Sequence, residues 1–194
     1  MFKTDKNARN AFMTKFDPSR AFRGTNWEGS GHYWQRVDAA VFDFNWKGIS
    51  CLNITKTIIK VFKTSEQEAA KTKHGVGEEV TNRILQTNTN RERLVCEFIG
   101  CCVEMRPTEV PLDEIEKATE DDQPLQYVVV EVDNEEVYWK DKNTGETKGP
   151  ITDVRYKRIV PWSEVLRGVT EEEAERFFPD GLLSNLAEAD EVLV

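Results

Sequence analysis

The sequence has few of the residues on which most catalytic and metal sites are built. Only two histidines, His32 and His74, occur among 194 residues, and the four cysteines form no C-x-x-C pair. A serine or cysteine nucleophile needs a base beside it, and no nucleophile motif such as G-x-S-x-G accompanies either histidine. Spacings common in structural zinc sites are missing too. We therefore expect no cofactor, no metal site and no enzymatic activity.

Long apolar runs and a leader peptide are also missing. No stretch reaches the roughly 18 apolar residues that cross a bilayer, and the first residues lack the apolar segment of a signal peptide. The cysteines show no disulfide framework, which predicts reduced and mostly buried thiols: Cys51, Cys96, Cys101 and Cys102. These absences predict a soluble cytoplasmic protein without membrane contact, in the host cytoplasm if the protein is viral.

Charged and aromatic residues are divided unevenly along the chain. The first 62 residues hold 11 of the 19 aromatic residues and ten Lys/Arg against five Asp/Glu, whereas the rest carries 16 basic and 30 acidic residues. Because phosphates would repel so much acid, the net charge of -9 argues against wrapping duplex DNA with the whole surface. Aromatic residues interleaved with cations are typical of surfaces that hold unpaired bases.

The pattern predicts an arm, one α+β domain and a tail. Residues 1–30 form a basic, aromatic N-terminal arm, residues 31–180 the domain, and residues 181–194 an acidic C-terminal tail. Phe12, Phe16 and Phe22 either fasten the arm to the core or contact a ligand. An Asn/Gly-containing turn joins β-rich runs at 31–44 and 49–62, and a second hairpin is expected from Tyr127 to Val160.

Helices are expected between and after these hairpins. We predict short helices at 66–73 and 78–86, and a longer one in which Leu94, Val95 and Phe98 begin an apolar face. A buried strand is the competing interpretation of residues 94–99. The acidic segment 107–124 is expected to be a loop with a short helix. Thr170 and Glu173 form a capping box that opens a final helix reaching about residue 178.

The candidate nucleic-acid-binding residues combine aromatic rings with nearby cations. Trp46 and Lys47 lie at the first turn, and a second basic and aromatic cluster surrounds Tyr156. We predict that the aromatic residues stack on bases and that the cations contact phosphates. The full set is Trp27, Tyr33, Trp34, Arg36, Trp46, Lys47, Lys56, Lys60, Trp139, Arg155, Tyr156, Lys157 and Arg158.

The run from Gly31 to Thr57, with its Gly-x-Tyr start, two strands and Gly-containing turn, resembles the opening of small phage-encoded single-stranded DNA-binding proteins. The resemblance covers under a third of the chain. It implies an antiparallel, OB-like β-barrel with inserted and appended helices. It also implies a replication or recombination partner recruited by the acidic tail. The matching residues are Tyr33, Trp34, Arg36, Phe42, Phe44, Trp46 and Lys47, with Glu188, Asp190 and Glu191 in the tail.

Three functions remain open at this level. The first is non-enzymatic binding of single-stranded nucleic acid. The second is a structural or assembly role, as a virion component or an oligomeric scaffold, in which the N-terminal arm forms the interface of a homo-oligomer and its aromatics act as anchors. The third is an acidic inhibitor whose carboxylates at residues 109–136 imitate phosphates. The first two functions depend on whether Phe42 and Phe44 face the core or a ligand, which the sequence leaves open.

Overall fold

The computed structural model describes residues 5–16, 31–62, 75–88, 90–119, 125–141 and 143–178. Four features expected from the sequence lie outside the described residues: Trp27, Phe22, the helix at 66–73, and the acidic tail at 181–194. No helix within the described ranges is both long enough and apolar enough to span a membrane.

The centre of the fold is a five-stranded antiparallel sheet in the order β3-β2-β1-β4-β5. Its strands are β1 (Gly31–Phe44), β2 (Ser50–Phe62), β3 (Glu79–Leu85), β4 (Val129–Lys140) and β5 (Thr147–Ile159). The two predicted hairpins are confirmed as β1–β2 and β4–β5. The α+β class is therefore correct, with strands that alternate inward and outward side chains as the sequence indicated.

One expected helix is a strand. Residues 78–86 were predicted to be helical, but residues 79–85 form β3 and pair with Cys51–Thr57 of β2. Val80, Asn82 and Ile84 are buried, while the residues between them are exposed. This period of two is the strand pattern, and pairing with β2 outweighs the weak helical preference of a short segment.

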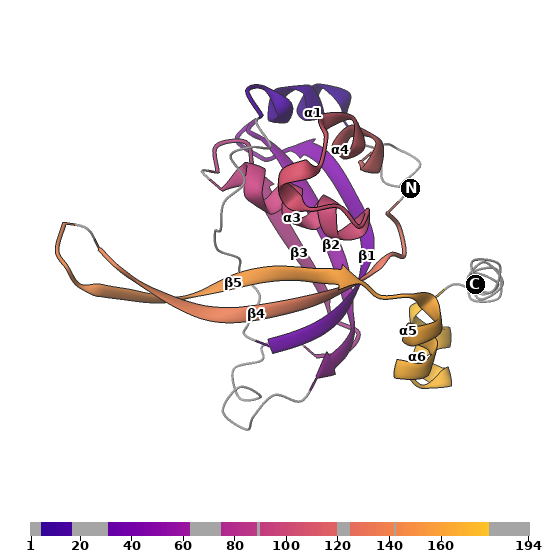
Figure 1. Cartoon of the computed structure of the whole chain (residues 1–194). Coiled ribbons are helices and arrows are strands. Elements are labelled where there is room, and N and C mark those ends of the chain that lie inside the picture. Colours follow the sequence, from indigo (N-terminus) through magenta and orange to yellow (C-terminus); the bar gives the residue numbers. More distant parts are fainter. Residues whose placement is uncertain are drawn as a thin grey trace.

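The predicted OB-like barrel is wrong, because the sheet is open. β3 and β5 form its two edges, and they do not pair within the described residues. β1 pairs with β4 only from Gly31 to Arg36, so the two hairpins diverge beyond this short contact. Helices pack on the apolar face of the sheet (Figure 1). This face is therefore buried without closure of the strands into a barrel.

Three helices and a 3-10 turn cover one face of the sheet: α1 (Lys6–Met13), α3 (Arg91–Cys102), η2 (Pro107–Glu109) and α4 (Leu112–Ala118). The predicted helix through residues 94–102 and the short helix in the acidic segment are thereby confirmed. Phe12 of α1, Phe42 of β1 and Phe98 of α3 are fully buried in the shared core. Phe12 lies 5.2 Å from Phe42 between ring centroids, so this part of the arm is fastened to its own chain.

A second, smaller core lies on the opposite face. Successive residues of a strand point to opposite faces, and Val130 belongs to the main core while Val129 belongs to the second. Two C-terminal helices cover this second core, α5 (Trp162–Gly168) and α6 (Glu171–Phe177). The capping box at Thr170 and Glu173 is present as predicted.

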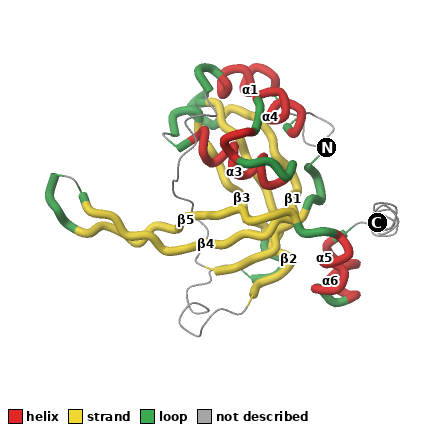
Figure 2. Tube along the Cα trace, viewed as in Figure 1, coloured by secondary structure: helices red, strands yellow, loops and turns green. Residues whose placement is uncertain are grey.

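The β4–β5 hairpin extends well beyond the sheet. Pairing of β4 with β1 ends at Asn134, whereas its pairing with β5 continues to Lys140 and Thr147. The ends of β4 and β5, residues 135–140 and 147–153, thus form a two-stranded ribbon that projects from the body (Figure 2). We call this segment the β-arm.

Candidate nucleic-acid interface

Three predicted site residues lie in the interior. Tyr33 and Lys56 are fully buried, and Trp34 is only 4% exposed in the core beneath α5 and α6. Lys56 Nζ donates a hydrogen bond of 3.2 Å to the hydroxyl of Tyr156. A base cannot stack on a ring that other side chains cover, so these residues support the fold in this structure. The sequence showed that strand positions alternate, but not which face the C-terminal helices would cover.

Lys60 and Arg36 are also engaged by their own chain. Lys60 Nζ donates a hydrogen bond of 2.7 Å to the carbonyl of Gly168 and lies 4.7 Å from the centroid of a Trp34 ring. Arg36 forms an ion pair with Asp38, which also accepts a hydrogen bond from Thr57. The contacts of Lys60 hold α5 against the sheet, and those of Arg36 join β1 to β2. Both cations therefore have partners within their own chain.

The second predicted cluster follows β5. Arg158 forms hydrogen bonds with Glu131 and Glu164, and the hydrogen bond to Glu164 is the main cause of its raised pKa. Lys157 makes a looser ion pair of 3.5 Å with Asp133. Arg155 is half-buried and is the register partner of Asp133. The backbone of Trp139 pairs with Lys148, but its side chain lies outside what the structure describes.

Tyr156, Lys157 and Arg158 line one wall of an open cleft of about 400 Å³. The opposite wall is the C-terminal part of α3 and the loop that follows it, which contributes Arg106 and Met105. The structure thus brings three of the predicted residues to one site. Arg106 was not predicted, because only the fold places residue 106 opposite residues 156–159.

Trp46 is the most exposed large apolar side chain among the described residues, at 85%. It lies in the β1–β2 turn, where the side chain of Asn45 accepts hydrogen bonds from the backbone amides of Lys47 and Ile49. Gly48 adopts a positive φ of 72°, which the tight turn requires. The turn is therefore well defined, and it presents Trp46 to solvent with Lys47 Nζ 4.6 Å from the ring centroid.

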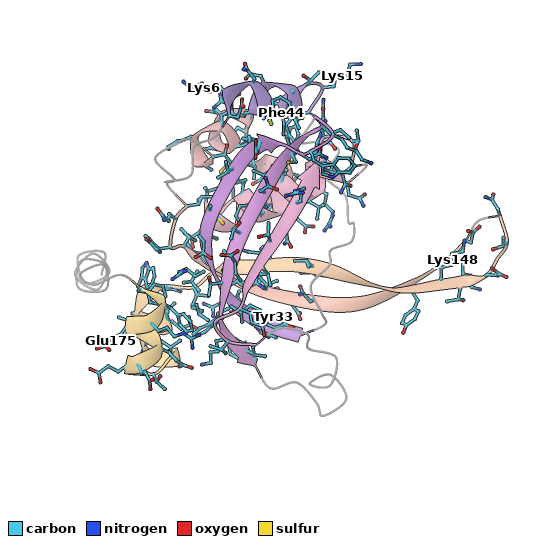
Figure 3. All side chains as sticks on the ribbon, turned by 180° about the vertical axis from the view of Figure 1, so that it is seen from behind. Lys6, Lys15, Tyr33, Phe44, Lys148 and Glu175 are labelled. Atoms are coloured by element: carbon cyan, nitrogen blue, oxygen red, sulfur yellow. The ribbon has the colours of Figure 1, made fainter. Side chains whose placement is uncertain are left out.

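Helix α1 and the turn that follows it bring two further lysines to this end of the molecule. The amide of Asp5 donates a hydrogen bond of 2.9 Å to the carbonyl of Phe42, which places the start of α1 beside the end of β1. Lys6 and Lys15 are exposed, and Figure 3 shows both at the same end as Phe44. We call Lys6, Lys15, Phe44, Trp46 and Lys47 the α1 end. Sequence reasoning omitted Lys6 and Lys15 from the site, and the basic composition of the arm was their only signal.

The network that fixes α1 is centred on Gln86 and Arg91. Gln86 Nε2 donates to the carbonyl of Ala11 over 2.7 Å and accepts from the hydroxyl of Ser50. Arg91 donates to the carbonyl of Phe12 over 2.9 Å and forms a buried ion pair with Glu92. Contacts from α3 and from the turn after β3 therefore hold α1 in place, so the α1 end is a preformed surface.

No protein-family model, curated protein or solved structure matches this chain. Within the described residues, no group of three or more His, Cys, Asp and Glu is arranged to hold a metal ion. The cysteines are free, as predicted, and Cys51, Cys96 and Cys102 are buried while Cys101 is half-buried. Burial raises the pKa of Cys96 and of Cys101 to about 12, so these thiols are protonated at neutral pH.

Proposed function

We propose that the protein binds single-stranded nucleic acid, without catalysis, through the α1 end. The observation that carries this proposal is Trp46, 85% exposed with the ammonium of Lys47 4.6 Å from its ring centroid. An indole left in water beside a cation offers a base one face to stack on and offers the neighbouring phosphate a charge.

The residues around Trp46 extend the surface. Phe44, in the same hairpin, is 38% exposed, and Lys6 of α1 and Lys15 in the turn after α1 lie at this end of the molecule. Stacking of one base on an aromatic side chain is worth about 1–3 kcal/mol, and each phosphate contact makes affinity fall with salt. Two aromatics and three lysines therefore support modest, salt-sensitive binding.

A single strand suits this surface better than a duplex. Stacking on Trp46 requires an unpaired base, and the lysines cover only one end of a protein whose net charge is -9. Two carboxylates also lie at this end and keep their negative charge: Asp5, which accepts hydrogen bonds from the amides of Asn7 and Ala8, and Asp43, which accepts one from the amide of Phe44. Phosphate contacts are therefore expected only close to Trp46, at Lys6, Lys15 and Lys47.

An assembly role is the second candidate, and the β-arm is what favours it. The arm projects from the body and exposes Tyr138 at 57%, which is typical of segments that contact another chain. The interface would then be the β-arm, because the described part of the N-terminal arm packs on its own sheet through Phe12.

One comparison separates the two candidates. Fluorescently labelled oligothymidylate is titrated with wild-type protein, Trp46→Ala and Tyr138→Ala, with anisotropy as the readout. Both positions are exposed aromatics, so neither change should alter folding much. Our proposal predicts that only Trp46→Ala weakens binding, by about tenfold for one lost stacked base. Equal affinities for all three proteins would contradict it.

A further inference from the structure

The cleft between α3 and β5 is bordered by three departures from regular structure. Lys157 is the extra residue of a β-bulge, since Glu131 pairs with Arg158 and the next residue of β4, Val132, pairs with Tyr156. Glu104 has a positive φ of 55°, which is uncommon for a residue other than glycine. Gly100 lets the following loop approach α3, because a Cβ there would lie 2.8 Å from the carbonyl oxygen of Met105.

Lys157, Glu104 and Gly100 all line the same cleft. Bulges redirect side chains and often lie beside functional sites. The cleft volume, about 400 Å³, falls in the range typical of small-ligand pockets. In the Schellman cap that ends α3, the amide of Met105 donates to the carbonyl of Gly100, which accounts for the positive φ of Glu104 and for the close approach at Gly100. The bulge at Lys157 is the departure that this helix end does not explain.

The cations of the cleft differ in how firmly they are held. Both carboxylate partners of Arg158 bond its guanidinium closely, so Arg158 supports the wall. Arg106 is 81% exposed and its ion pair with Glu109 spans 3.5 Å, and the ion pair of Lys157 with Asp133 spans the same distance. Exposed pairs of this kind contribute little, about 0–1 kcal/mol, so an anion can take over either cation at small cost.

The remaining lining suits the base and sugar of a nucleotide. Tyr156, Met105 and Ile159 provide aromatic and apolar surface. The α3 wall carries the carboxylates of Glu97, which is ion-paired with Arg93, and of Glu104, which follows the negative end of the helix dipole. These negative charges disfavour a phosphate there and favour groups that donate hydrogen bonds. A phosphate must therefore lie toward Arg106 and Lys157, with the donor-bearing edge of a base toward α3.

We infer that this cleft binds one nucleotide unit, with its phosphate on Arg106 and Lys157 and its base against Tyr156. The choice of a nucleotide as the ligand rests on the proposed function, whereas the cleft and its cations do not. A carboxylate accepts a hydrogen bond from the amino group of cytosine, so cytidine monophosphate is the natural probe.

The test is a titration of ¹⁵N-labelled full-length protein with cytidine monophosphate, followed by NMR shifts and calorimetry. Parallel titrations use inorganic phosphate and cytidine. We expect shifts at the amides of residues 156–159, and tighter binding of the nucleotide than of either part. Arg106→Ala with Lys157→Ala should weaken binding by about tenfold or more, since charge-assisted contacts are lost. The matched control removes two exposed, paired lysines elsewhere, Lys117→Ala with Lys148→Ala, and should leave binding unchanged.

Three outcomes would overturn the inference: no shifts at residues 156–159, equal binding of inorganic phosphate and nucleotide, or equal losses in the cleft and control variants. Failure of the cleft and failure of the proposed function are distinguishable with a labelled single-stranded oligonucleotide. Binding of the oligonucleotide without the mononucleotide would refute the cleft alone. Binding of the mononucleotide without the oligonucleotide would refute the function and leave the cleft intact.

Discussion

The ammonium of Lys60 and the carbonyl oxygen of Gly168 lie 2.7 Å apart, joining the middle of the sheet to the end of α5. The rings of Trp34 and Phe62 flank the ammonium at 4.7 Å and 5.2 Å from their centroids. Lys60 thus caps the C-terminal carbonyl of α5 and contacts two aromatic rings, so its role is to stabilise the fold. Together with the buried side chains of Val165, Phe177 and Phe178, it holds α5 and α6 on the sheet although each helix is only seven residues long.

Gly168→Ala should destabilise the protein by disturbing this contact. A Cβ at residue 168 would lie 2.3 Å from a ring carbon of Trp34, and the indole is too closely packed to move away. Overpacking of this kind costs about 1–3 kcal/mol in the free energy of unfolding. Gly75→Ala is the matched control, since its Cβ would meet only a side-chain oxygen at 3.7 Å. Urea unfolding curves measure both, and equal midpoints would contradict the packing described.

Arg91→Met should lower the free energy of unfolding by more than Gly168→Ala does, and it should detach α1 from the sheet. The change leaves Glu92 buried without the guanidinium that it contacts at 2.7 Å, and it removes the donor to the carbonyl of Phe12. Breaking a buried ion pair from one side costs about 3–5 kcal/mol. Adding Glu92→Gln removes the uncompensated charge and should restore part of the loss. Denaturant curves for the two single variants and the double variant give the coupling energy, and additive effects would refute the pairing.

Alkaline pH should destabilise the protein through its buried thiols. The thiols of Cys96 and Cys101 ionise near 9.0 when unfolded but only near 12 when folded. Their contribution is complete below pH 9.0, and it is lost as the pH rises toward about 12, because the unfolded state then binds fewer protons. The unfolding midpoint of wild type should therefore fall more steeply over this range than that of Cys96→Ala with Cys101→Ala. Parallel slopes would contradict the burial described.

Shortening the β-arm should leave the body intact. Val137 and Ile151 are register partners, so replacing residues 138–150 with Asn-Gly joins them through a two-residue turn suited to hairpins. Because β4 pairs with β1 only up to Asn134, we expect the free energy of unfolding to change by no more than about 0.5 kcal/mol. A loss of more than about 2 kcal/mol would show that the arm packs on the body. If the assembly role is correct, the same deletion abolishes oligomers in sedimentation.

The sequence predicts individual strands, turns and helices better than it predicts which faces of the sheet the helices cover. Turn residues and alternation located both hairpins, and the apolar spacing from Leu94 located α3. The segment at residues 79–85 is too short to distinguish a strand from a helix without its partner β2. Closure of the sheet was also undetermined, because it depends on whether helices cover the apolar face.

The candidate site shows the same limit. Trp34 and Trp46 stand in similar basic and aromatic surroundings in the sequence, yet one is 4% exposed and the other 85%. The difference depends on α5, which follows more than 100 residues later and covers Trp34. The sequence shows where the cations are but not which groups they bind. Lys60 donates a hydrogen bond to the carbonyl of Gly168, and Arg158 donates to the carboxylate of Glu164.

The most direct test of single-strand binding is a salt series. A labelled oligothymidylate and the matching duplex are titrated with wild-type protein and with the variant Lys6→Gln, Lys15→Gln, Lys47→Gln at rising salt. We predict that wild type prefers the single strand. Its log affinity should fall linearly with log salt, and the slope of the variant should be shallower by about 2, at roughly 0.7 for each lost phosphate contact. Absence of binding at low salt, or identical slopes, would contradict the account.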